Sequence, residues 1–90
     1  MTMPTASVVL TGALSHSDAS AVSCEGRTVR EVLEDCCRTR PALRHRIFRL
    51  NGDVWVSVFV NGRSVMQREG LETPIADGDE VRVMPPIVGG

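Results

Sequence analysis

Two glycines close the sequence, and they carry its clearest chemical signal. Gly89 and Gly90 have no side chains, so a peptide that ends in them can enter a narrow active-site cleft of another protein. Pro85 and Pro86 cannot donate hydrogen bonds to a neighbouring strand, so we expect them to end a strand and to stiffen the segment that follows. The reactive atom of such a segment is the carbonyl carbon of Gly90.

A free carboxylate at Gly90 is a poor electrophile and needs activation, most simply as an acyl-adenylate formed from ATP. A sulfur nucleophile that displaces AMP then leaves a terminal thiocarboxylate, whereas an amine leaves an amide. Two terminal glycines arise by chance in roughly one chain in two hundred. The two terminal glycines are stronger evidence for a function because they follow two prolines and a predicted strand. We therefore predict that Gly90 is the functional residue.

The cysteines and histidines carry a weaker signal. Cys36 and Cys37 lack the C-x-x-C spacing of redox and zinc sites, and they fall on the apolar stripe of a predicted helix. With Cys24 they make an odd number, which is a poor basis for disulfides, so we expect all three to pack in the core. His16 and His45 are isolated in the sequence, and we expect neither a metal site nor a bound cofactor.

The composition limits the class of protein. A chain of 90 residues supports one small domain. A net charge of −1 and an aromatic content of 3% disfavour nucleic-acid binding, and all ten basic residues are arginines, which excludes lysine chemistry. The sequence has no apolar run long enough to cross a membrane and no signal-peptide pattern at its start. We therefore expect a cytoplasmic protein.

One helix is clearly predicted. Thr28 is a suitable N-cap, and Glu31 three residues later completes a capping-box pattern. Pro41 ends the helix, and residues 42–53 indicate a short helical turn followed by a tight turn. The apolar stripe of the helix consists of Val29, Val32, Leu33, Cys36 and Cys37.

Alternating apolar residues predict the strands. The predicted strands cover residues 7–11, 19–24, 54–60, 63–67 and 80–84. The second of these is weak, and residues 54–60 give the strongest signal because valine occupies every second position. Asn61 and Gly62 are typical of a type I′ hairpin turn, and Leu71 and Ile75 are candidate core residues in a later loop.

This order of elements predicts an α+β protein with a β-grasp, or ubiquitin-like, fold. The first and last strands can pair in parallel at the centre of a mixed sheet of four to five strands, covered on one face by the helix. Residues 1–84 would form the domain, and residues 85–90 a flexible tail. Phe59 and Met84 would lie on the open face near the tail, where an apolar spot is a candidate docking site.

Two charged stretches of opposite sign remain. The basic stretch consists of Arg38, Arg40, Arg44, Arg46 and Arg49. The acidic stretch consists of Glu69, Glu72, Asp77, Asp79 and Glu80. We expect two solvated faces; the alternative is that one of them steers a partner.

Three segments of the chain resemble one known family. They are residues 60–62 (VNG), 70–81 (GLETPIADGDEV) and 84–90 (MPPIVGG). They are similar to the ThiS/MoaD family of ubiquitin-like sulfur carriers, above all to its MoaD-like and CysO-like branches. The tail resembles the PPVAGG and PAVAGG endings of those branches, with Ile87 and Val88 in place of Val-Ala.

The resemblance implies that the protein is a co-substrate and not an enzyme. It implies adenylation and thiocarboxylation at Gly90, next to Gly89, by an E1-like adenylyltransferase that uses ATP. It also implies a sulfur donor, which is a desulfurase, a rhodanese or sulfide. The acceptor would resemble a PLP-dependent cysteine synthase, a thiazole synthase or the molybdopterin synthase large subunit, and the partners would grip residues 85–88.

Two alternatives stay open at this point. The same tail suits a ubiquitin-like modifier that is joined through Gly90 to target lysines. It also suits a non-catalytic interaction subunit whose tail completes the active site of a partner. Deletion of Gly89 and Gly90 distinguishes the interaction subunit from the two roles that use Gly90, because a binding module keeps its partner without these residues.

Overall fold

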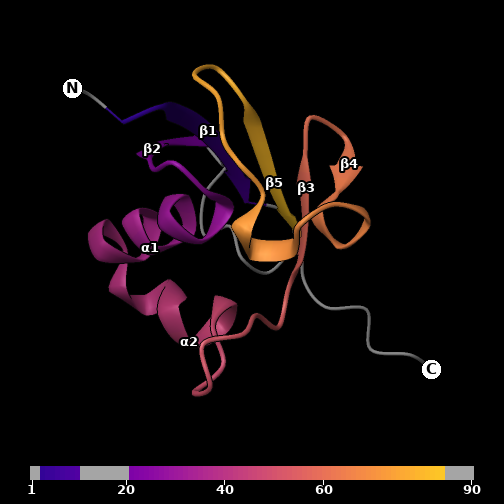
Figure 1. The fold of residues 1–90 in the computed structure, drawn as a ribbon. Helices are drawn as coiled ribbons and strands as arrows, with labels where there is room; N and C mark the ends of the chain where they lie inside the picture. The colour runs from indigo at the N-terminus through magenta and orange to yellow at the C-terminus, as the bar shows by residue number, and fades with distance from the viewer. Residues whose placement is uncertain (1–2, 11–20, 85–90) are drawn as a thin grey trace.

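The computed structural model describes residues 3–10 and 21–84 (Figure 1). Predictions for residues 1–2, 11–20 and 85–90 lie outside this part of the chain, among them the loop that contains His16. The strands are β1 (Thr5–Leu10), β2 (Ala21–Glu25), β3 (Ser57–Val60), β4 (Arg63–Ser64) and β5 (Glu80–Met84). The helices are α1 (Val29–Thr39) and α2 (Arg44–Ile47), with 3-10 helices η2 (Pro41–Leu43), η3 (Val65–Gln67) and η4 (Gly70–Glu72).

The strands form one mixed sheet in the order β2-β1-β5-β3-β4. β1 and β5 pair in parallel, and the other neighbouring strands pair antiparallel. The first and last strands of the sequence therefore lie side by side inside the sheet, with α1 packed against it (Figure 1). This topology confirms the predicted β-grasp fold, with five strands.

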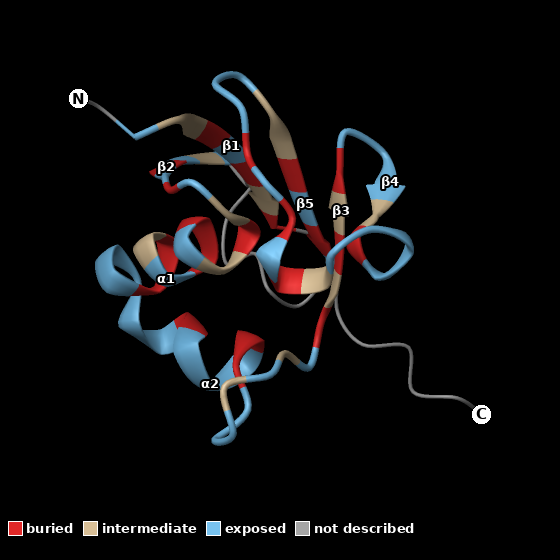
Figure 2. Ribbon diagram, in the orientation of Figure 1, coloured by how far each residue is buried: buried red, intermediate tan, exposed pale blue. Residues whose placement is uncertain are grey.

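The core lies between α1 and one face of the sheet. All five residues of the predicted apolar stripe of α1 are buried. In the central strands every second residue is buried, and Val8, Val81 and Val83 are fully so. Figure 2 shows the buried segments on the strands and on the side of α1 toward them, with exposed residues on its outer side.

The residues predicted to begin and end α1 act nearly as expected. The Thr28 hydroxyl accepts a hydrogen bond from the backbone N–H of Glu31 at 3.3 Å. The Glu31 carboxylate accepts one from the N–H of Arg27, the residue before the N-cap, at 2.9 Å. The helix ends at Arg40, and Pro41 begins η2 instead of continuing α1.

The prediction of one strand over residues 54–60 is wrong in its first half. Only Ser57–Val60 joins the sheet, where it pairs with Val81 to Met84 of β5. The residues before β3 turn toward α2 instead, and the N–H of Trp55 donates to the carbonyl of Ile47 at 2.9 Å. There Val54 forms an isolated bridge with Phe48.

The strand predicted over residues 63–67 is also too long. β4 consists of Arg63–Ser64 alone. The Ser64 hydroxyl accepts a hydrogen bond from the N–H of Met66 at 3.2 Å, which starts a 3-10 turn and buries Val65. This local bond diverts the backbone from the ladder.

The first two strands begin or end a few residues from their predicted bounds of 7–11 and 19–24, and residues 11–20 lie outside the described part of the chain. Two further local predictions are confirmed. Asn61 and Gly62 have φ values of 50° and 85°, as a type I′ turn requires. Leu71 and Ile75 are buried in the core. Within residues 3–10 and 21–84, the structure contains no helix with the length and apolar character that a membrane span requires.

Candidate functional site

The C-terminal end of β5 is the part of the candidate site that the structure describes. Met84 is the last residue of this strand, and the glycine-ended segment follows it in the sequence. The predicted site residues beyond it lie outside the described part of the chain, and their roles stay predictions. They are Pro85, Pro86, Ile87, Val88, Gly89 and Gly90.

β5 is anchored on both sides up to its end. Val83 is fully buried and lies opposite Leu10 of β1 and Val58 of β3. Met84 itself lies opposite Ser57, the first residue of β3. Ladder pairing therefore fixes the position of the last residue of the strand.

Phe59 and Met84 lie on the face of the sheet opposite the core, as predicted from the alternation. Val58 and Val83, their neighbours along the two strands, are buried on the core side. Phe59 is half-buried and pairs with Arg82, while Met84 is 40% exposed. They are therefore diagonal neighbours on adjacent strands, within reach of one partner surface. Their docking role stays a prediction.

A second apolar group lies near the end of β5, and the sequence analysis did not single it out. Trp55 is 48% exposed, and Leu50 is fully exposed. The guanidinium of Arg49 lies over the Trp55 ring, 4.2 Å from its centroid. The sequence contains one indication of this exposure, because the tight turn predicted after residue 50 places the apolar Leu50 at its tip.

The three cysteines are buried thiols, as predicted. Burial, together with the neighbouring Cys36, raises the pKa of Cys37 from 9.0 to about 11. A hydrogen bond with Cys36 and burial raise the pKa of Cys24 even further. At neutral pH Cys24 and Cys37 are therefore protonated, and neither is a nucleophile.

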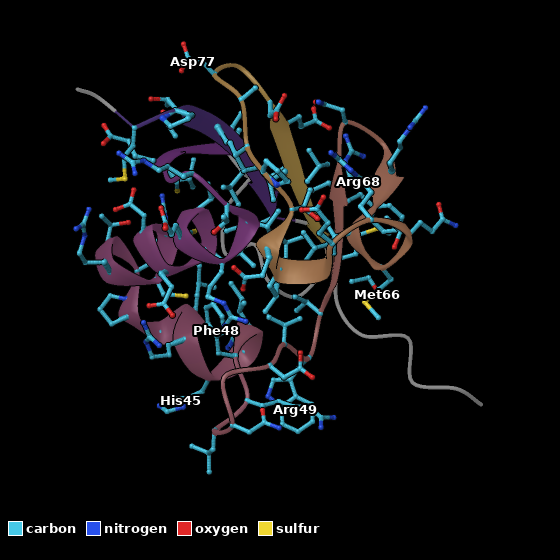
Figure 3. The ribbon with its side chains drawn as sticks, viewed as in Figure 1. His45, Phe48, Arg49, Met66, Arg68 and Asp77 are labelled. Carbon is cyan, nitrogen blue, oxygen red and sulfur yellow. The ribbon has the colours of Figure 1, made fainter. Side chains whose placement is uncertain are left out.

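The described residues offer no alternative site for a metal. Within them, no three His, Cys, Asp or Glu side chains gather closely enough to hold an ion. His45 lies exposed on α2, where Figure 3 shows it at the outside of the molecule.

The fold and the position of the segment that follows β5 define the class of protein. A five-stranded mixed sheet with a helix on one face, whose inner last strand leads to the C-terminal residues, is a ubiquitin-like β-grasp domain. The chain belongs to the ThiS family, whose family model matches residues 8–90. This confirms the family resemblance that the sequence indicated.

Individual relatives agree with this assignment. A protein of Archaeoglobus fulgidus, named as a sulfur carrier, is 34% identical over 71 residues, which are 77% of this chain and 81% of that protein. The sulfur carrier protein CysO of Mycobacterium tuberculosis is 31% identical over 74 residues, covering 78% and 80% of the two chains. The solution structure of small archaeal modifier protein 1 from Methanosarcina acetivorans superimposes with a TM-score of 0.85, at 28% identity and 98% coverage of both chains.

Proposed function

We propose that this protein is a sulfur carrier whose Gly90 carboxylate is adenylated and then converted to a thiocarboxylate. The observation that carries the proposal is the course of β5, which lies between β1 and β3 and leads into PPIVGG. The ThiS family model extends to residue 90, so the match includes the glycines. Two of the relatives described above bear the name of sulfur carriers.

The proposed reaction has two balanced steps. First, the Gly90 carboxylate attacks the α-phosphorus of ATP, which forms the acyl-adenylate and releases pyrophosphate. Second, hydrosulfide attacks the acyl carbon and displaces AMP, which leaves the thiocarboxylate and a proton. ATP and the catalytic groups belong to an E1-like adenylyltransferase, so the carrier acts as a co-substrate and holds no cofactor.

The donor and acceptor of sulfur belong to the same proposal. The donor is sulfide itself, or the persulfide of a desulfurase or a rhodanese; a persulfide displaces AMP to form an acyl disulfide, which a thiol then reduces to the thiocarboxylate, with a disulfide as the second product. The acceptor is an enzyme of the PLP-dependent cysteine synthase, thiazole synthase or molybdopterin synthase type. We place these reactions in the cytoplasm, because a reducing compartment keeps the three buried thiols reduced.

Intact-mass measurement tests the proposal. The full chain is mixed with ATP, a candidate adenylyltransferase and sulfide, and its C-terminal peptide is fragmented. We expect one oxygen replaced by one sulfur at Gly90, and no such change after deletion of Gly90. Localisation is essential, because oxidation of any of the four methionines gives nearly the same mass. An unchanged tail with every adenylyltransferase tested contradicts the proposal.

A modifier role is the second candidate, because a structural relative is named a small archaeal modifier protein. In that role an amine displaces AMP from Gly90 and forms an amide with a target lysine. This chain has no lysine of its own, since all ten basic residues are arginines. Any lysine conjugate must therefore contain a second protein. An adenylate that resists sulfide but yields such conjugates favours the modifier role.

The docking role of Phe59 and Met84 can be tested with a matched control. Replacement of Met84 by aspartate should raise the KM for the activating enzyme severalfold and leave kcat unchanged, because it weakens docking without touching Gly90. Met3 is the control, since it is similarly exposed (42% against 40%) and precedes β1, at the end of the parallel pair away from Met84. Equal effects of Met3→Asp and Met84→Asp contradict the docking role.

A further inference from the structure

Arg49, Leu50 and Trp55 form a protruding group that the proposed function does not explain, and we call it the knob. Leu50 and Trp55 are among the most exposed large apolar side chains of the described residues. Trp55 is the only tryptophan of a chain whose aromatic content is 3%. About half of this side chain is exposed, although the core of the fold is built mainly from aliphatic residues. The knob therefore indicates a contact with another molecule.

The backbone of the knob is rigid. The N–H of Arg49 donates to the carbonyl of Asp53 at 2.8 Å, and the N–H of Gly52 donates back to the carbonyl of Arg49 at 3.0 Å. The Asn51 side chain accepts the N–H of Asp53 at 3.0 Å, and Arg30 of α1 donates to the carbonyl of Gly52 at 3.1 Å. Leu50 is thus held outward before any partner arrives, so that little ordering remains for the binding step.

One residue of the knob, Trp55, lies near the end of β5. Trp55 is two residues before Ser57, which lies opposite Met84. Two residues span about 7 Å at most, so Trp55 lies close to the end of β5. Figure 3 shows Arg49 on the α2 side of the molecule and Arg68 well away from it, on the β3 and β4 side. A protein that binds the end of β5 therefore has Trp55 within reach.

The charge of the knob indicates the chemistry of its partner. Arg38 and Arg44 pair with Asp35 and Glu34 of α1, whereas Arg49 stacks on Trp55. No carboxylate pairs with Arg49 among the described residues. The knob thus offers two apolar groups beside a cation that has an aromatic neighbour but no carboxylate partner within residues 3–10 and 21–84.

We propose that the knob is a second docking element, which inserts Leu50 and Trp55 into an apolar pocket rimmed by carboxylates. The pocket belongs to the protein that receives the tail, so its location rests on the proposed function. Tryptophan and arginine are the residues most often responsible for binding energy at interfaces. A carboxylate on the rim supplies a counter-ion for Arg49 and makes association salt-dependent.

The single tryptophan provides a direct measurement. The full chain is labelled with 5-fluorotryptophan and titrated, without ATP, with the candidate adenylyltransferase and separately with the candidate acceptor enzyme. We expect one fluorine resonance that shifts on binding to at least one of them. Arg49→Glu and Leu50→Ser should each raise Kd about tenfold or more. The matched controls, Arg68→Glu and Met66→Ser, alter exposed residues away from the knob and should change Kd less than twofold.

The outcomes separate this inference from the proposed function. A chain that is activated at Gly90 but whose Trp55 resonance does not move, or whose knob variants bind like the controls, overturns the inference alone. A resonance that shifts, with weaker binding of the knob variants, supports the inference even if Gly90 is never activated. Absence of binding to both enzymes overturns it as well. Far-UV circular dichroism of each variant confirms that the fold is intact.

Discussion

Raising the pH should destabilise this protein through its buried thiols, and the effect can be measured without interference. The chain has no tyrosine and no lysine. Arginine stays protonated throughout, and the terminal amine titrates near pH 8. Between pH 9 and 11 the cysteines are therefore the groups that change charge.

Cys37 contributes one part of the expected loss; the raised pKa of Cys24 adds to this loss, whereas the pKa of Cys36, lowered by its hydrogen bond with Cys24, acts in the opposite direction. The pKa of Cys37 rises from 9.0 in an exposed state to about 11 in the fold, chiefly because burial disfavours the thiolate. Below pH 9 the Cys37 thiol is protonated in both the folded and the unfolded chain, and its full contribution to stability is present. Above pH 9 the unfolded chain ionises first, so the contribution of Cys37 to the free energy of unfolding should fall by about 2 kcal/mol by pH 11. The total free energy of unfolding of a small domain is only roughly 5 to 15 kcal/mol.

Urea unfolding followed by circular dichroism, at pH 8 to 11 with a phosphine reductant, measures this loss. Cys37→Ala is the comparison, since it removes the titrating group. This variant should start from a lower stability at pH 8, because it leaves a cavity, and should then fall less steeply. Parallel curves for the wild type and Cys37→Ala from pH 9 to 11 would refute the reasoning.

Three further predictions concern packing and the knob. Leu33→Ala should lower the free energy of unfolding by about 2 to 5 kcal/mol, because Leu33 is fully buried, whereas Leu50→Ala should change it by less than about 0.5 kcal/mol; similar urea midpoints would contradict this. Gly26→Ala should cost about 1 to 3 kcal/mol in the same assay, since its methyl group would lie 2.6 Å from a backbone nitrogen of α1. Iodide should quench Trp55 fluorescence more strongly in the wild type than in Arg49→Gln, because the guanidinium over the ring attracts anions; equal quenching constants would show that this charge has no influence.

The sequence predicted the helix better than the strand lengths, because the helix is bounded by local signals. Thr28 and Pro41 act within a few residues of the bonds they make or prevent. The length of β3 depends instead on its pairing with β5, some 25 residues further along the chain. Alternating valines over residues 54–60 indicate which face is buried, but they contain no information about how far that pairing extends.

The same distinction applies to the candidate site. The placement of Phe59 and Met84 on the open face followed from alternation alone. The contact between Arg49 and Trp55 did not, since it depends on a tight turn that brings together residues six positions apart. Exposure of Leu50 was indicated only by the tight turn predicted after it, because an apolar residue among arginines fits a core position as well as a surface one.

The position of β5 also determines how the domain responds to force. A pull on the residues after Met84 acts along β5 and loads the ladders to β1 and β3 in shear. The hydrogen bonds of two ladders then share the load, whereas a pull along the edge strand β4 would load only its one ladder to β3. If an enzyme acts on the tail as proposed, β5 can transmit a pull on the tail to two neighbouring strands.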